Sequence, residues 1–272
     1  MPEGPELRHS RDILREIARG KNVIDLHAAS TGRYKSKDPE GLDSIKQDLP
    51  LEVVDIDVKG KFMWWTFKSA TRHWRMWVTY GMSGQWATEE DTHTAFVVDL
   101  GDKKLFFIDP RHFGTIKFTN DESAHSKKLS TLGPDMLDDT PVTPELFAEK
   151  ILLKPNKTIA EILMDQSCVS GVGNYIKSEC LYRSGISPHR KAIDLESQEI
   201  LKLWSETIST CRESYVDHGA TLRTYKNVDG SSGDAQFRFR IYSKKSCELG
   251  HPSIREETLD GRTSWWCSVC QK

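Results

Sequence analysis

Long apolar runs are missing from this sequence of 272 residues. No stretch of 18 consecutive apolar residues occurs, and the first residues lack the positively charged start and apolar core of a secretion signal. We therefore expect no contact with a membrane and a soluble, intracellular protein, nuclear or cytoplasmic according to the organism. Hydrophobic residues make up 37% and charged residues 29% of the chain, which leaves room for two modest globular domains.

A strong net charge is missing as well. The formal net charge is −2, which by itself argues against a polyanionic partner. The charge is unevenly distributed, however, because the residues from 150 onward carry 18 Lys and Arg against 15 Asp and Glu, a net of +3 that leaves −5 for the first 149. A local basic face could still bind nucleic acid.

Cysteine is scarce, with six residues, and three of them cluster near the end beside a histidine. The spacing is Cys247-x3-His251-x15-Cys267-x2-Cys270. Two ligand pairs separated by an insert of hairpin length fit tetrahedral zinc, and without a secretion signal metal ligation is favoured over disulfides. We expect one structural zinc ion that stabilises a module too small for its own core, with Arg262 at the tip of the hairpin.

The opening residues offer an amine beside a carboxylic acid. If Met1 is removed, as is usual before a small residue, Pro2 becomes a free secondary amine that can act as a nucleophile near neutral pH. Glu3 lies within reach as a proton donor or acceptor. An isolated Pro-Glu pair at a terminus is more often a frayed end, so this interpretation depends on the rest of the chain.

Periodicity predicts an α+β protein with two domains. Short strands with turn signals over about 20–120 indicate a β-sandwich or barrel, and a helix precedes them. A polar, turn-rich segment then leads to a helical unit. The predicted helices are 6–18, 144–153, 158–165, 175–184 and about 195–217. The predicted boundaries are 1–122 for a catalytic sandwich, 123–143 for a linker, 144–235 for the helical domain and 236–272 for a zinc finger.

Three loops of the first half carry residue types suited to nucleic acid. Lys61 follows a Gly60 turn and could meet a phosphate, although a solvated hairpin tip is the commoner fate of such a lysine. A Gly-bracketed loop presents Met82, whose usual role is packing. Another loop presents Arg111 and Phe113, a cation and an aromatic wedge of the kind that fills the gap left by an extruded base.

A glycine-rich turn, Gly171-Val172-Gly173-Asn174, opens the helix predicted at 175–184. Free backbone N–H groups at such a helix start, together with the Asn174 amide, would suit a phosphate. A helix start without any ligand is a serious alternative for this motif taken alone.

Together these motifs resemble the formamidopyrimidine-DNA glycosylase and endonuclease VIII family, and the match runs from end to end. The motifs that carry the resemblance are Pro2-Glu3-Gly4-Pro5-Glu6, Gly60-Lys61, Gly81-Met82-Ser83-Gly84, Asp109-Pro110-Arg111-x-Phe113-Gly114, Leu163-Met164-Asp165-Gln166 with Gly171-Val172-Gly173-Asn174, and the terminal zinc hairpin. The resemblance implies a β-sandwich, a helix-two-turn-helix domain and a zinc finger, and it implies that damaged DNA binds in the cleft between them. It also implies that the protein is a monomer.

By position, the resemblance also implies roles for individual residues. Pro2 is similar to the nucleophile that attacks C1′ and forms a Schiff base, and Glu3 to the acid that protonates the sugar ring oxygen. Lys61 resembles a lysine that contacts a flanking phosphate, and Glu6 a supporting carboxylate. Met82, Arg111 and Phe113 match the trio that fills the space of the flipped nucleotide in the duplex, and His93 matches a histidine that contacts DNA. Asn174 and Arg262 match residues that contact phosphates, and the residue matched by Arg262 also takes part in δ-elimination.

The activity implied is a bifunctional DNA glycosylase and AP lyase of base excision repair that uses no catalytic metal. The Cys-His-Cys-Cys pattern departs from the four-cysteine bacterial finger and resembles that of vertebrate endonuclease VIII-like enzymes. On that basis we expect oxidised pyrimidines and hydantoins to be preferred over 8-oxoguanine. Two alternatives remain: a zinc-finger DNA-binding protein with weak or no catalysis, and a lyase specialised for abasic or single-stranded DNA.

Overall fold

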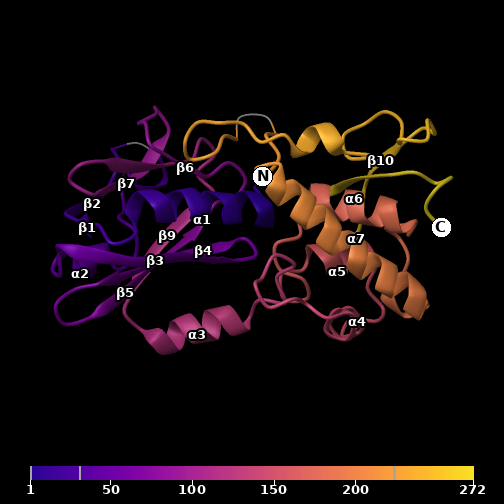
Figure 1. The fold of residues 1–272 in the computed structure, drawn as a ribbon, viewed down its shortest axis with the longest axis horizontal. Coiled ribbons are helices and arrows are strands. Elements are labelled where there is room, and N and C mark those ends of the chain that lie inside the picture. Colours follow the sequence, from indigo (N-terminus) through magenta and orange to yellow (C-terminus); the bar gives the residue numbers. More distant parts are fainter. Residues whose placement is uncertain (1, 31, 223–224) are drawn as a thin grey trace.

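The chain folds into two lobes in the computed structural model, which describes residues 2–30, 32–222 and 225–272 (Figure 1). Strands fill the N-terminal lobe, helices fill the C-terminal lobe, and a β-hairpin lies at the C-terminal end of the molecule. The predicted α+β class is therefore confirmed. Among the described residues, none of the helices has both the length and the apolar character needed to span a bilayer.

Two antiparallel sheets pack face to face in the N-terminal lobe and confirm the predicted sandwich. Their orders are β1-β3-β4-β5-β9 and β2-β7-β8-β6. Alternate side chains of the strands turn inward, and Trp65 of one sheet meets Trp86 of the other with ring centroids 5.3 Å apart. The strands are β1 (Asn22–Val23), β2 (Asp25–Ala28), β3 (Leu51–Lys59), β4 (Phe62–Lys68), β5 (His73–Thr79), β6 (Gln85–Ala87), β7 (Thr94–Asp99), β8 (Lys104–Ile108) and β9 (Thr115–Thr119).

Helix α1 (Gly4–Ala18) carries the start of the chain along the sandwich and against the C-terminal lobe. Leu7 and Leu14 are fully buried two helical turns apart, so one stripe of the helix joins the sandwich core. On its polar side, Arg15 Nε lies 2.9 Å from Asp55 Oδ1 of β3. The N-terminus is thereby fixed between the two lobes.

The C-terminal lobe has its own apolar core, built mainly from helices α4 to α7. The long helix α7 packs on α6 and α4, and α6 contacts the hairpin strand β11. The helices are α4 (Pro144–Leu152), α5 (Ile159–Met164), α6 (Asn174–Ser184) and α7 (Ser197–Val216), and the hairpin strands are β10 (Ile254–Glu257) and β11 (Thr263–Trp266). All four helices and the hairpin lie where the sequence predicted them.

A helix occupies the start of the segment that we predicted as a turn-rich linker, and that detail of the prediction is wrong. Helix α3 (Glu122–Ser130) begins at Asp121, whose Oδ1 accepts a hydrogen bond from Ala124 N at 3.0 Å. The helix was missed because it buries only His125, against Trp64, and so has no apolar stripe. The short helix α2 (Leu42–Lys46) and strands β6 and β9 were also not predicted.

Part of the segment 225–231 packs against the N-terminal lobe, although the predicted boundaries assign it to the C-terminal domain. Tyr225 and Val228 are buried in the sandwich core. Tyr225 OH donates to Glu6 O at 3.3 Å, and Thr88 N donates to Val228 O at 3.2 Å. Two isolated apolar residues in a polar segment give no periodic signal, so only the tertiary structure reveals this contact.

Candidate functional site

The N-terminal residues are held by Glu6, which forms hydrogen bonds to several parts of the chain. Glu3 N donates to Glu6 Oε2 at 2.7 Å, which closes a capping box at the start of α1. Glu6 Oε1 accepts bonds from Tyr175 OH at 2.8 Å and from Ala220 N at 2.6 Å. The carboxylate predicted to give support thus fixes the backbone of Glu3 to the C-terminal lobe.

The side chain of Glu3 binds the N-terminus of α6. Its carboxylate oxygens accept bonds from Tyr175 N at 3.0 Å and Ile176 N at 3.3 Å. A side chain at Gly173 would collide with this carboxyl group, so glycine is required there. We predicted that these backbone amides are free for phosphate, and that was wrong, because a carboxylate of the same chain already occupies the helix N-terminus.

The turn that carries Lys61 packs closely against the C-terminal lobe, because Gly60 lies next to Gly171. Gly60 has a φ of 59°, and its N–H donates to Asp135 Oδ2 at 2.8 Å. A Cβ on Gly60 would lie 2.5 Å from Gly171 N, and Gly4 N donates to Gly171 O at 2.9 Å. The turn is therefore not a solvated hairpin tip. It is locked against the C-terminal lobe, with Lys61 half-buried.

The charges of Glu3 and Lys61 are coupled in this buried setting. Burial raises the pKa of Glu3 from 4.5 to about 7, and the positive charge of Lys61 opposes part of that rise. Burial likewise lowers the pKa of Lys61, which Glu3 and Glu6 oppose, and burial raises the pKa of Glu6. Pro2 is buried beside them, whereas Met1 lies outside the described residues. A carboxyl group that is part protonated near neutrality beside an amine suits proton transfer.

Met82, Arg111 and Phe113 stand on two loops that pack against each other. The Arg111 guanidinium carbon lies 5.3 Å from the centroid of the Phe113 ring, and Phe113 is 53% exposed. A Cβ on Gly81, next to Met82, would lie 2.7 Å from the Phe113 carbonyl carbon. The structure thus brings the predicted trio together on the surface of the N-terminal lobe.

Asp109 holds these loops in place, a role that we did not predict for it. This buried carboxylate accepts bonds from Ser83 Oγ at 2.7 Å and from Gly114 N at 2.6 Å. Its own N–H donates to the carbonyl of His93 at 3.0 Å, so the exposed His93 lies at the edge of the same loop. The available signal was an aspartate at the start of a turn, a position where its side chain commonly binds the backbone.

Asn174 contacts the hairpin at the residue after Arg262, where the hairpin touches α6. Asn174 Nδ2 donates to Thr263 O at 2.7 Å. The exposed Arg262 is held at the tip by its N–H, which donates to Asp260 Oδ1 at 3.2 Å. Burial lowers the pKa of Lys61, the two glutamates oppose that change, and the positive charge of Arg262 adds to it.

A buried ion pair that was not predicted fastens the hairpin tip to α6. Lys177 Nζ lies 2.5 Å from Asp260 Oδ2, with side-chain exposures of 0% and 2%. Replacing Lys177 by methionine leaves the Asp260 charge buried without its partner, so we expect the free energy of unfolding to fall by about 3–5 kcal/mol in urea titrations. Adding Asp260→Asn removes the stranded charge and should recover much of the loss.

The exposed Lys202 of α7 provides the matched control for this prediction. Lys202→Met should stay within about 0.5 kcal/mol of the parent protein, because surface substitutions seldom change stability more. An unchanged urea midpoint for Lys177→Met would show that the ion pair does not stabilise the hairpin.

The four predicted metal ligands converge at the base of the hairpin. The ligand atoms of Cys247, His251, Cys267 and Cys270 all lie within 4.8 Å of one another. Cys247 Sγ is 4.0 Å from Cys270 Sγ and 3.7 Å from His251 Nδ1. Ligands at about 2.3 Å from a tetrahedral zinc ion would be separated by about 3.8 Å, so this cluster fits a structural metal.

The fold and the site together define a two-lobed α+β protein whose N-terminal residues meet the start of α6 at the junction of the lobes. Residues 1–116 match the family model of the formamidopyrimidine-DNA glycosylase N-terminal domain, and residues 132–226 match that of the formamidopyrimidine-DNA glycosylase H2TH domain. The formamidopyrimidine-DNA glycosylase of Bacillus anthracis is 31% identical over 278 residues, covering 100% of this chain and 99% of the relative. The chain therefore belongs to the formamidopyrimidine-DNA glycosylase family, and it is a DNA glycosylase with AP lyase activity.

Solved structures show the same fold. The MutM (Fpg) protein of Thermus thermophilus superposes with a TM-score of 0.86 at 25% identity, covering 99% of this chain and 98% of that one. A complex of the Lactococcus lactis Fpg with DNA containing an abasic site gives a TM-score of 0.85 at 24% identity, with 99% of each chain covered.

Proposed function

We propose that this glycosylase excises oxidised bases from DNA, with pyrimidines and hydantoins favoured, and then cleaves the strand by β- and δ-elimination through a Schiff base at Pro2. The observation that carries the proposal is the placement of Glu3. Two amides of α6 hold its carboxyl group, and burial raises its pKa to about 7 beside Lys61. A proton donor is thus built next to the N-terminal amine.

Each catalytic residue has a distinct part in this scheme. The Pro2 nitrogen, free once Met1 is removed, attacks C1′, and the C1′–O4′ bond breaks as Glu3 protonates the ring oxygen. The C1′–base bond then breaks, and the base leaves with the proton that the Pro2 nitrogen gives up, so that an iminium forms. The resulting iminium acidifies the C2′ protons, so the 3′ phosphate and then the 5′ phosphate can be eliminated. Lys61 holds a flanking phosphate and assists proton transfer, and Arg262 assists δ-elimination. Glu6 keeps Glu3 in place.

DNA contacts follow from the same arrangement. Met82, Arg111 and Phe113 enter the duplex and fill the space of the extruded nucleotide, which offsets part of the few kcal/mol that flipping costs. His93 lies beside this loop, and Asn174 and Arg262 grip phosphates from the other lobe. Zinc at the Cys247, His251, Cys267 and Cys270 cluster would hold the hairpin that carries Arg262.

Borohydride trapping tests the chemistry. With abasic duplex DNA, protein that mass spectrometry shows to have lost Met1 should form a covalent complex, and Pro2→Gly should trap poorly. A processed wild-type protein that cannot be trapped would leave only the alternative of a DNA-binding protein without catalysis.

A panel of oligonucleotides tests the substrate. Duplexes with one thymine glycol or one spiroiminodihydantoin should be processed faster than duplexes with one 8-oxoguanine. The same lesions in single strands separate the remaining alternative, because a lyase for abasic or single-stranded DNA would cut abasic strands yet excise little from duplex. The wedge trio predicts that duplex is accepted.

A further inference from the structure

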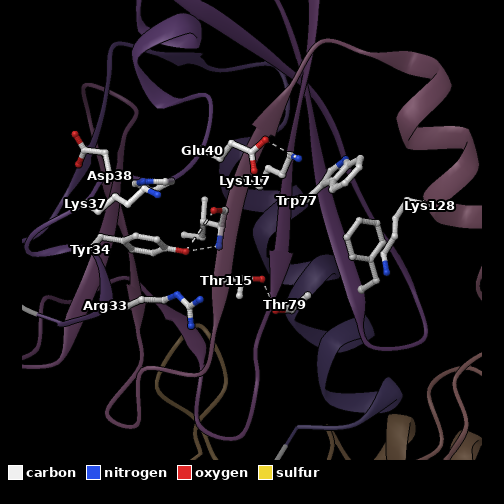
Figure 2. A pocket seen from close by; sticks show the side chains of 13 residues that line it. Arg33, Tyr34, Lys37, Asp38, Glu40, Trp77, Thr79, Thr115, Lys117 and Lys128 are labelled. Atoms are coloured by element: carbon white, nitrogen blue, oxygen red, sulfur yellow. Dashed lines mark hydrogen bonds and ion pairs between the residues drawn. The ribbon is translucent and has the colours of Figure 1, made fainter.

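A large hollow lies against strands β5 and β9 of the five-stranded sheet (Figure 2). Its lining residues do not include Pro2, Glu3 or Lys61. Its volume is about 650 Å³, which lies in the range of cavities that hold a nucleotide-sized ligand. The segment 33–40 forms one wall, strands β5 and β9 form the floor, and Lys128 of α3 lies at the opposite side.

The hollow begins at the base of the two wedge loops. Thr79 ends β5, directly before the loop of Met82, and Thr115 begins β9, directly after the loop of Phe113. Both threonines line the hollow, with their Oγ1 atoms 2.6 Å apart. Arg33 also lines it, and its Nη1 donates to the carbonyl of His112 within the second loop at 3.2 Å. The hollow therefore adjoins both loops that carry the wedge.

The lining carries a net positive charge, from four cations against the two carboxylates of Asp38 and Glu40, although the lobe around it is acidic. Arg33, Lys37 and Lys128 have no carboxylate partner among the residues that the structure describes. Lys117, by contrast, is paired with Glu40 at 2.8 Å. The first 149 residues carry a net charge of −5, from 20 Lys and Arg against 25 Asp and Glu, so three unpaired cations around one hollow are a local exception.

Aromatic rings accompany the cations. Lys128 Nζ lies 5.3 Å from the centroid of the buried Phe62 ring, and Lys117 Nζ lies 5.6 Å from that of Trp77. Trp77 is half-buried on the floor of the hollow, between the two lysines (Figure 2). Cations that track a phosphate backbone beside an aromatic surface are the combination that binds unstacked nucleotides.

We propose that this hollow is an accessory DNA subsite that binds a backbone phosphate and an unstacked nucleotide next to the lesion. Arg33, Lys37 and Lys128 hold the phosphates, and Trp77 supports the nucleotide. Insertion of the wedge distorts the duplex next to these loops, which brings a phosphodiester within their reach. This inference rests on the proposed function, since it requires DNA at the wedge loops.

The salt dependence of binding tests the subsite. Wild-type protein and the double variant Lys37→Ala/Lys128→Ala are titrated with duplex DNA containing a tetrahydrofuran abasic analogue, at salt concentrations from about 50 to 200 mM. Lys128 lies over the Phe62 ring, and among the described residues no hydrogen bond or ion pair joins either lysine side chain to a wedge loop, so we expect the loops to stay in place. Two lost phosphate contacts should reduce the slope of log K against log salt by about 1.8.

The matched control removes the same charge at the opposite end of the sheets. Lys68 closes β4 and Lys103 lies in the turn before β8, and both are exposed. Lys68→Ala/Lys103→Ala should keep the wild-type slope. If the slope of log K against log salt falls as much in this control as in Lys37→Ala/Lys128→Ala, only the net charge matters, and the proposed subsite is overturned.

The same titrations with single-stranded DNA show which DNA strand supplies the bound nucleotide. If the first double variant also lowers the slope on the lesion strand alone, by about 1.4, the bound nucleotide belongs to the damaged strand. If the slope changes only on duplex, the nucleotide belongs to the opposite strand. If the Lys37→Ala/Lys128→Ala variant shows the same slopes as the wild-type protein on both substrates, the proposal is overturned. Failure of borohydride trapping by wild-type protein would instead remove the proposed chemistry without altering these slopes.

Discussion

Replacing Glu3 by glutamine is expected to slow base excision by about 10²–10⁴-fold, the usual contribution of a general acid. Glutamine cannot protonate the ring oxygen. It also keeps only one acceptor atom for Tyr175 N and Ile176 N, so the side chain would be held less firmly. Single-turnover excision of thymine glycol from duplex DNA measures the effect.

The pH dependence sharpens this prediction. The pKa of Glu3 is raised to about 7 by burial, so the protonated acid is lost as pH rises through that value, and the excision rate should fall with it. The fall of the excision rate at high pH, the high-pH limb of the profile, should be missing in Glu3→Gln. The native state also holds this proton more tightly than the unfolded chain, whose pKa is near 4.5, so the stability that Glu3 contributes at low pH is lost as pH rises through about 7.

Glu16 offers a control on the same helix. It is exposed on α1, and Glu16→Gln makes the same chemical replacement of a carboxyl group by an amide. Its excision rate should stay within about twofold of wild type, since about 0.4 kcal/mol corresponds to that factor. An equal loss of excision in both variants, or an unaltered high-pH limb in Glu3→Gln, would assign the acid to another residue.

Loss of a metal ligand is expected to have the second large effect. Cys267→Ala removes one thiolate from the cluster, and the apolar cluster beside the hairpin is small, with Trp265 packed against Ile241 and Tyr182 of α6. Structural zinc supplies about 10–16 kcal/mol of apparent binding energy in small modules, so the hairpin should lose its order with its ion. Atomic emission spectroscopy should find about one zinc ion per wild-type chain and far less in the variant.

DNA affinity should fall in the same variant. The hairpin presents Arg262, and a charge-assisted hydrogen bond to phosphate contributes about 1.5–3 kcal/mol, which corresponds to about 10- to 150-fold in Kd. Cys168 is buried outside the cluster, and Cys168→Ala controls for the removal of a thiol. A Cys267→Ala protein that keeps both its metal and its affinity would exclude the structural role.

Local chemistry in the sequence and the family resemblance together supplied the candidate residues of the site. Alternating strands and helical stripes predicted the two lobes, because periodicity follows from which face is buried. The ligand spacing predicted the cluster of Cys247, His251, Cys267 and Cys270, which the structure brings together. Residue type suggested Arg111 and Phe113, the family resemblance added Met82, and the two loops that carry them do meet. The weak elements α3 and β6 escaped because they bury too little to leave a pattern.

The tertiary structure decided what these residues can do. Glu3 meets the amides of Tyr175 and Ile176 only because Gly4, Gly60 and Gly171 let three distant segments touch, and that burial sets its pKa. Lys177 and Asp260 lie 83 positions apart and show no joint signal. The sequence by itself thus determined which groups are present and on which elements they lie. Their burial, pairing and protonation depend on contacts between elements far apart in the chain, which no local pattern encodes.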